Sequence, residues 1–354
     1  MEGELRAGIA GFGVVGKRRK VCIEGRDDMV CVAVCDRDPA NAPSFVEGLT
    51  FHTDYRDLLT EDLDVLFVCL PNDLAAEVSI AALRDGLHVF CEKPPGRTLE
   101  EIASVIEVER QHPDQKLMYG FNHRYHESVE DALAMMKTGE LGDLISLRGI
   151  YGKSKLITFD QPDWRTKRQI AGGGVLLDQG IHMVDLMRLF AGEFAQVHSF
   201  ISNSHWRYDV EDNAYALMRT EAGVVAMLNS SATQWRHRFS LELTFARGSM
   251  MLGGILSSSK SYGSETLTVV RANTDRDNGD PREQTTLYND DRSWEKEVAA
   301  FANVIESKEP VVRNGSHDAF GTMALVASIY YADPVWRAAY EIPDPASTVR
   351  TNAW

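Results

Sequence analysis

The sequence predicts an α/β protein with a parallel sheet followed by a second domain of mixed structure. Up to about residue 121, short apolar runs alternate with helical patterns, as in the strand–helix–strand units of a parallel sheet. From about residue 143, several strand-like segments follow one another, which favours a mostly antiparallel sheet in an α+β domain. A chain of 354 residues is too long for one ordinary core, so we expect two domains, residues 1–122 and 123–354.

The first domain opens with a buried strand at residues 5–11 that enters a glycine-rich turn. A helix is predicted over residues 14–25, with Val14, Val15, Val21 and Cys22 on its inner side. The later elements continue the alternation: strands at residues 29–35, 65–70, 88–91 and 116–121, and helices at residues 75–85 and 99–111.

The second domain begins near residues 121–126, where the alternation stops. Strands are predicted at residues 143–152, 195–204, 213–220, 223–233, 238–247 and 265–272. Helices are predicted at residues 128–138, 180–191, 293–307 and 317–332. Only the polar stretch at 273–284 suggests a lack of regular structure.

Composition excludes several classes of function. The net charge of −15 argues against nonspecific nucleic-acid binding, which needs clustered Lys and Arg, although a local basic pocket for an anion remains compatible with it. No apolar run has the length of about 20 residues that a membrane span requires. The five cysteines include no CxxC pair, so we expect no metal site and a reducing, cytoplasmic location.

The segment after the first strand has the spacing GxGxxG, with Gly11, Gly13 and Gly16. The first glycine permits a tight turn, the second lets the backbone approach a pyrophosphate, and the third lets the helix pack closely on the strand. The phosphates would lie at a helix N-terminus, where N–H groups and the dipole favour negative charge. The segment therefore predicts a dinucleotide site, with cofactor contacts from Gly11, Phe12, Gly13, Val14, Val15 and Gly16; a purely structural turn is the alternative.

Asp36 closes the second strand and is the expected acceptor for the adenosine ribose hydroxyls, which favours NAD. Arg37 leaves NADP open as an alternative, because it would pair with a 2′-phosphate if Asp36 swung aside. A solvated surface charge is an equally good interpretation of Arg37.

Polar and turn residues follow several of the predicted strands of the first domain. Because ligands of open α/β sheets bind at the carboxyl ends of the strands, these residues should form one site. We expect further cofactor contacts from Leu70, Pro71, Asn72, Glu92, Lys93 and Asn122.

Lys93 and His182 are the candidate acid–base residues. Oxidising a secondary alcohol removes a hydride from carbon and a proton from oxygen, and the proton needs a group of suitable pKa within reach. Lys93 stands directly after a strand end, before Pro94 and Pro95. By itself it reads equally well as a surface lysine before a proline turn.

Asp178 and His182 stand at positions i and i+4, so on a helix they would share one face. A carboxylate there would fix the tautomer and orientation of the imidazole. Taken singly, His182 reads as a core histidine and Asp178 as a helix N-cap. The run of three glycines before them, residues 172–174, favours a backbone that approaches a ligand closely.

With these segments in place, the chain resembles the glucose–fructose oxidoreductase / inositol dehydrogenase / MocA (Gfo/Idh/MocA) family. The matching pieces are GFGVVG at 11–16, EKP at 92–94, WR at 164–165 and GGGVLLDQGIHMVD at 172–185. The resemblance implies a Rossmann domain followed by a domain with a large open sheet, which in the family often forms the interface of dimers or tetramers. It also implies catalytic roles for Lys93, Asp178 and His182, and places Trp164 and Arg165 near the nicotinamide. A buried indole and a surface guanidinium are the alternatives for that pair.

The substrate side is less determined. Besides Lys93, Asp178 and His182, we expect substrate contacts from Arg124, Tyr125, Lys155, Arg165 and Trp235. Arg124 would otherwise brace the joint between the domains. The basic cluster of Lys153, Lys155, Arg165, Lys167 and Arg168 suits a phosphate or carboxylate, or is a solvated loop. Trp235 would stack on a sugar ring or nucleobase, or lie in the core.

The leading hypothesis is an NAD(P)-dependent oxidoreductase that acts on a sugar or nucleotide sugar, as in surface-polysaccharide biosynthesis. A free polyol or inositol dehydrogenase is the alternative within the enzyme class. A cofactor-binding sensor without catalysis is the alternative from another class.

Overall fold

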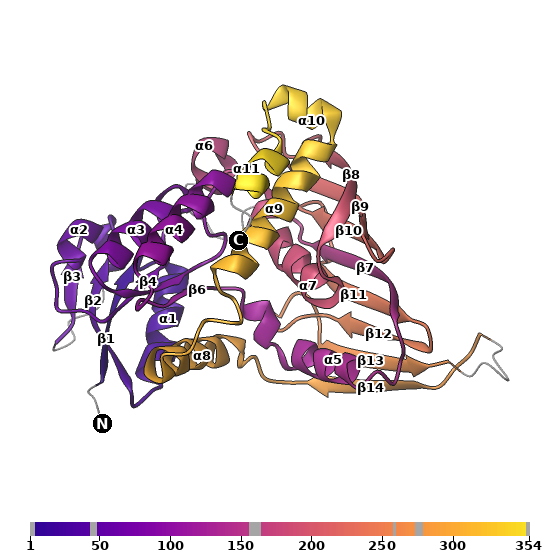
Figure 1. Ribbon diagram of the computed structural model, residues 1–354, viewed down its shortest axis with the longest axis horizontal. Coiled ribbons are helices and arrows are strands. Elements are labelled where there is room, and N and C mark those ends of the chain that lie inside the picture. Colours follow the sequence, from indigo (N-terminus) through magenta and orange to yellow (C-terminus); the bar gives the residue numbers. More distant parts are fainter. Residues whose placement is uncertain (1–3, 43–47, 156–163, 258–259, 273–278, 352–354) are drawn as a thin grey trace. The chain divides into compact units, whose positions relative to one another are not determined.

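The computed structural model describes residues 4–42, 48–155, 164–257, 260–272 and 279–351 (Figure 1). The chain divides into two compact units. Unit 1 comprises residues 1–121, 169–172 and 294–320, and unit 2 comprises residues 122–168, 173–293 and 321–354. Residues 273–278 of the predicted polar stretch lie outside the described part.

The centre of unit 1 is a six-stranded parallel sheet in the order β3-β2-β1-β4-β5-β6. This confirms the predicted Rossmann-type sheet. The strand order reverses between β1 and β4, and ligands of such sheets bind at this switch point. The strands are β1 (Leu5–Ala10), β2 (Met29–Cys35), β3 (Thr50–His52), β4 (Val65–Val68), β5 (His88–Cys91) and β6 (Leu117–Tyr119).

Helices connect these strands. They are α1 (Val14–Glu24), α2 (Tyr55–Leu58), α3 (Asn72–Arg84) and α4 (Leu99–Gln111), with the short η1 (Pro39–Asn41) between β2 and β3. Unit 1 also contains nearly all of α8 (Ser293–Ser307), which comes from far along the chain. The sequence patterns did not predict β3 or α2, because each spans too few residues to establish a period.

Helix α1 differs from the prediction in the face that it buries. Val14 and Val21, expected on the inner side, are 60% and 68% exposed, whereas Arg19 is fully buried. The buried positions Gly16, Arg19 and Ile23 follow the helical spacing i, i+3, i+7. Cys22 is buried as expected, but counting apolar residues alone missed position 19, whose buried guanidinium pairs with Glu92 and Glu297.

Unit 2 is built on an eight-stranded sheet in the order β14-β13-β12-β11-β7-β10-β9-β8. Only the β10–β7 pair is parallel, so the predicted, mostly antiparallel sheet is confirmed. The strands are β7 (Leu144–Gly152), β8 (Phe194–Ser202), β9 (Asn213–Thr220), β10 (Val225–Ser231), β11 (Arg238–Phe245), β12 (Gly248–Gly253), β13 (Glu265–Arg271) and β14 (Glu283–Tyr288). Strands β12 and β14 were not predicted.

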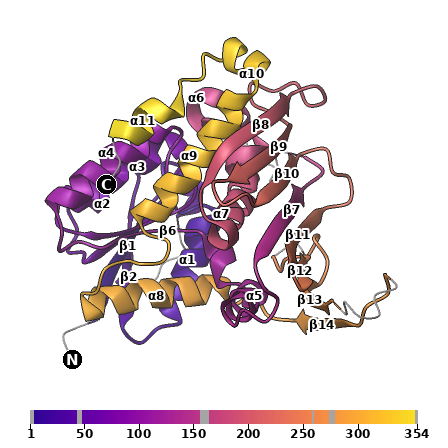
Figure 2. The ribbon, with the colours of Figure 1, turned by 45° about the vertical axis from the view of Figure 1, so that its right-hand side comes forward.

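One face of this sheet carries helices. Helix α5 (Glu127–Lys137) packs on β12 and β13, and α7 (Ile181–Ala191) packs on β7 and β10 (Figure 2). The remaining short and C-terminal elements are η2 (Asn122–Tyr125), η3 (Trp164–Thr166), α6 (Arg168–Ala171), the π-helical turn η4 (Leu176–Gly180), α9 (Ser316–Ala332), α10 (Pro334–Ala339) and α11 (Pro345–Thr351).

The opposite face of the sheet is open. Large apolar side chains stand exposed on it at alternating strand positions, including Phe200 at 79% and Leu217 at 51%. We call this set the open face: Phe200, Tyr215, Leu217, Met227, Met251 and Leu287. No helix in the described part of the chain is both long and apolar enough to span a bilayer.

Candidate active site

The glycine turn of unit 1 lies between β1 and α1, at the switch point of the sheet. Gly11 has φ +94°, and a Cβ there would lie 2.3 Å from the carbonyl oxygen of Cys69. A Cβ on Gly16 would lie 2.0 Å from the carbonyl oxygen of Gly11. Both positions therefore require glycine for the fold itself.

Gly13 differs from its two neighbours in the motif, because a Cβ there would meet nothing within 4 Å. It caps the N-terminus of α1 without a side-chain hydrogen bond to the helix. The first turn of α1 therefore has no side-chain cap, and the space beside Gly13 is open. An open backbone cradle at a helix N-terminus fits the pyrophosphate of a dinucleotide.

Asp36 follows β2 and is tied to this turn. Its carboxylate accepts hydrogen bonds from the backbone N–H of Phe12 at 3.0 Å and of Asp38 at 2.9 Å. These bonds hold Asp36 in place beside the turn, and the neighbouring Arg37 is exposed. A fixed carboxylate at this position suits ribose hydroxyls better than a 2′-phosphate.

The predicted residues Leu70 and Pro71 lie in the loop after β4, and Asn72 begins α3. Leu70 and Pro71 are half-buried, and Asn72 is only 6% exposed. The side-chain amide of Asn72 donates to the carbonyl oxygen of Ala171 at 2.7 Å. Asn72 thus has a structural partner within unit 1.

Glu92 at the end of β5 belongs to a buried ionic cluster with Arg19 and Glu297. Arg19 lies 2.6 Å from Glu92 and 2.7 Å from Glu297, and its Cζ lies over the rings of Phe90 and Trp294. Burial raises the pKa of Glu297 to about 8, because one guanidinium cannot compensate two carboxylates away from water. The sequence patterns missed both Arg19 and Glu297. The only signal for Arg19 was its helical spacing from Gly16.

Lys93 follows Glu92 directly and is half-buried. The backbone N–H of Glu92 donates to the carbonyl oxygen of Val68 at 2.9 Å, which places this segment at the carboxyl ends of β4 and β5. The Lys93–Pro94 peptide is cis, and Pro94 and Pro95 are both buried.

In unit 2, the segment before His182 folds into the π-helical turn η4. Glu211 secures its start: the carboxylate accepts from the N–H of Gly174 at 2.7 Å, the N–H of Leu176 at 3.0 Å and the hydroxyl of Tyr330 at 2.7 Å. A Cβ on Gly174 would lie 2.0 Å from the carbonyl oxygen of Glu211, so this close approach needs glycine. Glu211 itself was not singled out from the sequence.

Asp178 lies in this turn and is held by two cations. Its carboxylate is 2.8 Å from Nζ of Lys153 and 3.4 Å from Nε of Arg165. The guanidinium of Arg165 stacks on the indole of Trp164, with 4.4 Å between Cζ and the ring centroid. Lys153 is buried at 5% exposure. The sequence patterns placed it only in a basic loop and did not predict its contact with Asp178.

His182 lies in the first turn of α7 and is 6% exposed. Its imidazole stacks on that of His123, with ring centroids 3.8 Å apart and planes inclined by 11°. Asn122, beside His123 in η2, donates from its amide to the hydroxyl of Ser293 at 2.9 Å. The printed contacts thus pair Asp178 with Arg165 and Lys153, and stack His182 on His123 beside Asn122, all within unit 2.

Arg124 is engaged elsewhere in unit 2. Its guanidinium bonds the carboxylate of Asp185 twice, at 2.7 Å each, and is 3% exposed. Thr322 also donates to Asp185, so the pair connects η2, α7 and α9. Both partners lie within unit 2, so the pair fixes η2 on α7. Tyr125 is buried at 4% exposure.

The remaining predicted substrate residues are more exposed. Trp235 is 66% exposed and meets His205 and Trp206 edge to face, at 5.3 Å and 6.4 Å between centroids. The residue before it, Gln234, donates its backbone N–H to the carbonyl oxygen of Lys153 at 2.9 Å.

The basic cluster of the sequence divides in the structure. Arg168 stacks on Tyr340, Lys153 and Arg165 reach Asp178, and Lys155 and Lys167 are exposed. Among the described residues, no group of three or more His, Cys, Asp or Glu side chains is arranged to hold a metal ion.

Comparison with family models gives two matches. Residues 5–121 match the oxidoreductase family with an NAD-binding Rossmann fold, and residues 129–251 match the GFO/IDH/MocA C-terminal domain. The first match agrees with the open cradle of unit 1, which therefore is an NAD-binding domain.

Curated relatives include sugar dehydrogenases. The chain is 27% identical to D-glucoside 3-dehydrogenase of Escherichia coli, over 92% of this chain and 94% of that protein. It is 29% identical to levoglucosan dehydrogenase of Pseudarthrobacter phenanthrenivorans, in an alignment that spans 56% of this chain and about half, 54%, of that protein.

Solved structures share the fold over nearly the whole chain. A levoglucosan dehydrogenase in complex with NADH superposes with a TM-score of 0.81 at 21% identity, covering 94% of this chain and 98% of that chain. A mutant 3-ketoreductase from Actinomadura kijaniata, in complex with TDP-benzene and NADP, gives a TM-score of 0.78 at 25% identity, covering 92% of this chain and 97% of that chain.

Proposed function

Because the chain belongs to the Gfo/Idh/MocA family of NAD(P)-dependent sugar oxidoreductases, we propose that it oxidises a secondary alcohol of a sugar or nucleotide sugar, or reduces the corresponding ketone. When bound, the nicotinamide cofactor would accept or donate the hydride. The chain's own residues bind the cofactor, orient the sugar and move the proton. NAD is the proposed cofactor and NADP the alternative.

The cofactor contacts are those of unit 1. Gly13 and the first turn of α1 cradle the pyrophosphate, and Asp36 accepts from the ribose hydroxyls. Leu70 and Pro71 add apolar surface to the cofactor site. Asn72 contributes less to cofactor binding, because its side-chain amide already donates to the carbonyl oxygen of Ala171. Trp164 and Arg165 are proposed as nicotinamide neighbours because they accompany Asp178 in its cluster.

Proton transfer is assigned to Lys93 and His182. The observation that carries this assignment is the cluster in unit 2, where a buried imidazole lies within one helical turn of a carboxylate held by Lys153 and Arg165. Such a site limits access of water and restricts the imidazole to few orientations, as acid–base catalysis requires. Asp178 orients the substrate hydroxyl or the imidazole.

The substrate proposed first is a nucleotide sugar, as in surface-polysaccharide biosynthesis. Two observations support it: Trp235 offers an exposed indole face for a base or second ring, and Lys155 is an exposed cation on the chain segment that begins with Lys153. The bound TDP compound of the 3-ketoreductase is in line with this class. A free polyol such as inositol is the second candidate, favoured by inositol 2-dehydrogenase among the relatives.

Replacement of the two proton-transfer residues tests the catalytic assignment. Lys93→Met and His182→Asn should each lower kcat by about 10²- to 10⁴-fold, the usual contribution of a general acid or base, and should leave cofactor affinity near wild type. Exposed Lys137→Met and His317→Asn are matched controls. Turnover near wild type in both variants would refute the assignment, and tight NAD binding without oxidation of any sugar would favour a sensor.

A panel of nucleotide sugars, glycosides and free cyclitols tests the substrate class, with reduced nicotinamide as the readout. Activity that depends on the nucleotide supports the first candidate, and Trp235→Ala should then raise KM for nucleotide sugars alone. Equal activity on free cyclitols would refute it.

The proposal also includes a cytoplasmic homodimer or homotetramer formed through the open face of unit 2. Leu217 and Met227 are partners in the β9–β10 register, and Phe200 and Tyr215 are partners in the β8–β9 register. An apolar surface continuous over three strands is typical of a protein interface.

A further inference from the structure

Two buried imidazoles lie face to face in unit 2. His123 from η2 is 7% exposed and His182 from α7 is 6% exposed, and their rings stack at 3.8 Å. Two protonated rings at this distance would repel each other strongly. The protonation state of His123 therefore affects whether His182 can take up a proton.

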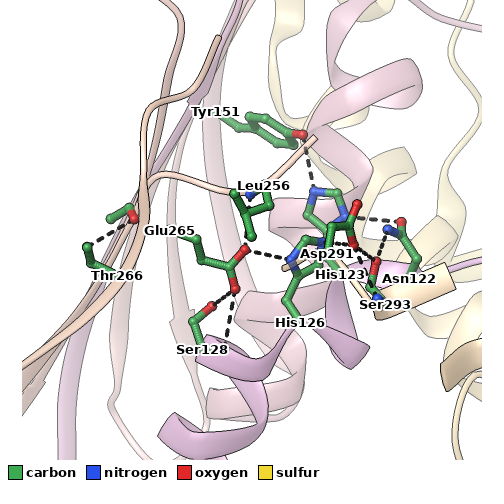
Figure 3. A network of polar contacts seen from close by, with 11 residues as sticks. Asn122, His123, His126, Ser128, Tyr151, Leu256, Glu265, Thr266, Asp291 and Ser293 are labelled. Atoms are coloured by element: carbon green, nitrogen blue, oxygen red, sulfur yellow. Dashed lines mark hydrogen bonds and ion pairs between the residues drawn. The ribbon is translucent and has the colours of Figure 1, made fainter. Parts of the chain in front are cut away.

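A chain of hydrogen bonds with one direction reaches His123 from Asp291 (Figure 3). The hydroxyl of Ser293 donates its only proton to the carboxylate of Asp291 at 2.6 Å, so the same oxygen must accept from the amide NH₂ of Asn122, at 2.9 Å. The carbonyl oxygen of Asn122 then faces Nδ1 of His123 at 3.2 Å. An amide oxygen has no proton to give, so Nδ1 carries the hydrogen.

The other ring nitrogen of His123 faces a phenol. Nε2 lies 3.1 Å from the hydroxyl of Tyr151. Burial raises the pKa of Tyr151 well above its ordinary value, so the phenol keeps its proton and donates it to Nε2. An imidazole that donates from Nδ1 and accepts at Nε2 is neutral and has a single tautomer.

The charged groups around the stacked pair are engaged with one another. His126, whose ring lies edge-on to His123 at 5.4 Å, donates from Nδ1 to Glu265 at 2.8 Å and has Asp291 at 3.9 Å on its other side. Burial opposes ionisation of Glu265, but bonds from His126 and Ser128 lower its pKa overall. The other nearby charges are the pairs Arg124–Asp185 and Asp178 with Lys153 and Arg165.

We propose that His123 is a positioning residue for His182, held as the neutral Nδ1–H tautomer by the chain from Asp291 and by Tyr151. Its flat ring fixes the orientation of the neighbouring imidazole. Because it adds no positive charge, it leaves His182 free to accept a proton. The tautomer stands on the contacts alone, whereas the effect on turnover rests on the proposed function.

Nitrogen-15 NMR of the full-length protein tests the tautomer directly. In protein labelled at histidine, His123 should show a protonated Nδ1 and an unprotonated Nε2, unchanged from about pH 8 to about pH 5.5, across the range where an ordinary imidazole titrates. Tyr151→Phe should let Nε2 take up a proton within that range. Assignment uses the spectrum of His123→Phe. A Nε2–H tautomer, or titration of His123 in the wild type, would overturn the proposal.

Kinetics test the positioning role. Tyr151→Phe and His123→Ala should lower kcat by about 10- to 100-fold, the cost of a misplaced catalytic group, with KM for the sugar and NAD affinity unchanged. His123→Phe keeps a flat ring and should lose less than His123→Ala. Tyr262→Phe is the matched control, because its hydroxyl donates to Gln179 instead of His123.

The outcomes separate the two proposals. Wild-type kcat in folded His123→Ala and Tyr151→Phe would overturn the positioning role and leave the proposed function intact. A wild-type protein that oxidises no sugar, but whose spectrum gives the Nδ1–H form, would refute the proposed function and support the tautomer.

Discussion

At the scale of the residue, the three glycines of the turn have different physical reasons to be glycine. Gly11 and Gly16 lack space for any side chain, whereas Gly13 faces an opening. The pattern GxGxxG places all three in one motif, and only the surrounding atoms separate those that serve the fold from the one that serves a ligand.

Alanine at two of these positions should therefore have opposite effects. Gly16→Ala should destabilise or prevent folding, because its Cβ would lie 2.0 Å from a backbone oxygen. Gly13→Ala should fold with a thermal midpoint near wild type and weaken NAD binding by about tenfold or more, since the methyl group would occupy the cofactor cradle. Thermal unfolding and calorimetric titration with NAD measure the two effects. Wild-type NAD affinity in Gly13→Ala would contradict this account of the turn.

Residue patterns identified the segments that contain candidate site residues, but not all of the residues that contact them. Asp178 and His182 were predicted from spacing, yet Lys153 reaches Asp178 from the end of β7. The stacking of His123 on His182 likewise joins positions far apart in the sequence. Such pairs have no local signal, because the fold rather than the spacing brings them together.

At the scale of the element, the Arg19 cluster connects α1, β5 and α8 within unit 1. Its three charged groups come from three elements, and Asn314 donates to Glu297 at 3.1 Å. An amide group offers both a donor and an acceptor, so Asn314 suits either protonation state of Glu297.

The raised pKa of Glu297 predicts how stability depends on pH. Burial raises the pKa of Glu297 to about 8 in the folded state, from the ordinary glutamate value of 4.5 that applies to the unfolded chain. The contribution is therefore fully present below the unfolded pKa and is lost as the pH rises through about 8. Wild-type thermal midpoints should fall over this interval, and Glu297→Gln, which mimics the neutral acid, should flatten the curve.

The same substitution at an ion pair nearer the surface is the control. Glu101→Gln affects the contact of Glu101 with Arg97 and should leave the slope of the wild type unchanged. Equal slopes for wild type and Glu297→Gln would show that Glu297 is already ionised in the folded protein.

Elements with a long, regular period were the ones that the sequence predicted. Helices α4 and α7 and strands β2 and β9 lie where the patterns placed them. Strand β14 was missed because five of its six residues are exposed, so it has no buried alternation. The π-helical turn could not be predicted from the sequence either, because it is held by hydrogen bonds to Glu211 and not by local propensity.

At the scale of the whole molecule, the order of the patterns predicted a parallel sheet followed by a mostly antiparallel one. It did not predict that residues 294–320 belong with unit 1. Sequence order alone assigns a late helix to the domain that precedes it, whereas the partners of Glu297, Phe301 and Asn314 place it with the first sheet.

The open face predicts an assembly that charge should disrupt. Leu217→Glu combined with Met227→Glu should reduce the molar mass in light scattering to that of a single chain, because burying two adjacent carboxylates is costly. The far-ultraviolet circular dichroism should stay unchanged. Val312→Glu, at a position 87% exposed in unit 1, is the control. A wild-type protein that already has the mass of one chain would reject the assembly.

The placement of α8 limits how this protein can be shortened. A fragment that stops at residue 122 would contain the complete nucleotide turn but not Glu297, leaving Arg19 with one carboxylate and the flank of β6 without Asn314. Anyone expressing the cofactor-binding portion alone should splice residues 294–320 onto it. Without residues 294–320, the fragment that stops at residue 122 is expected to be insoluble.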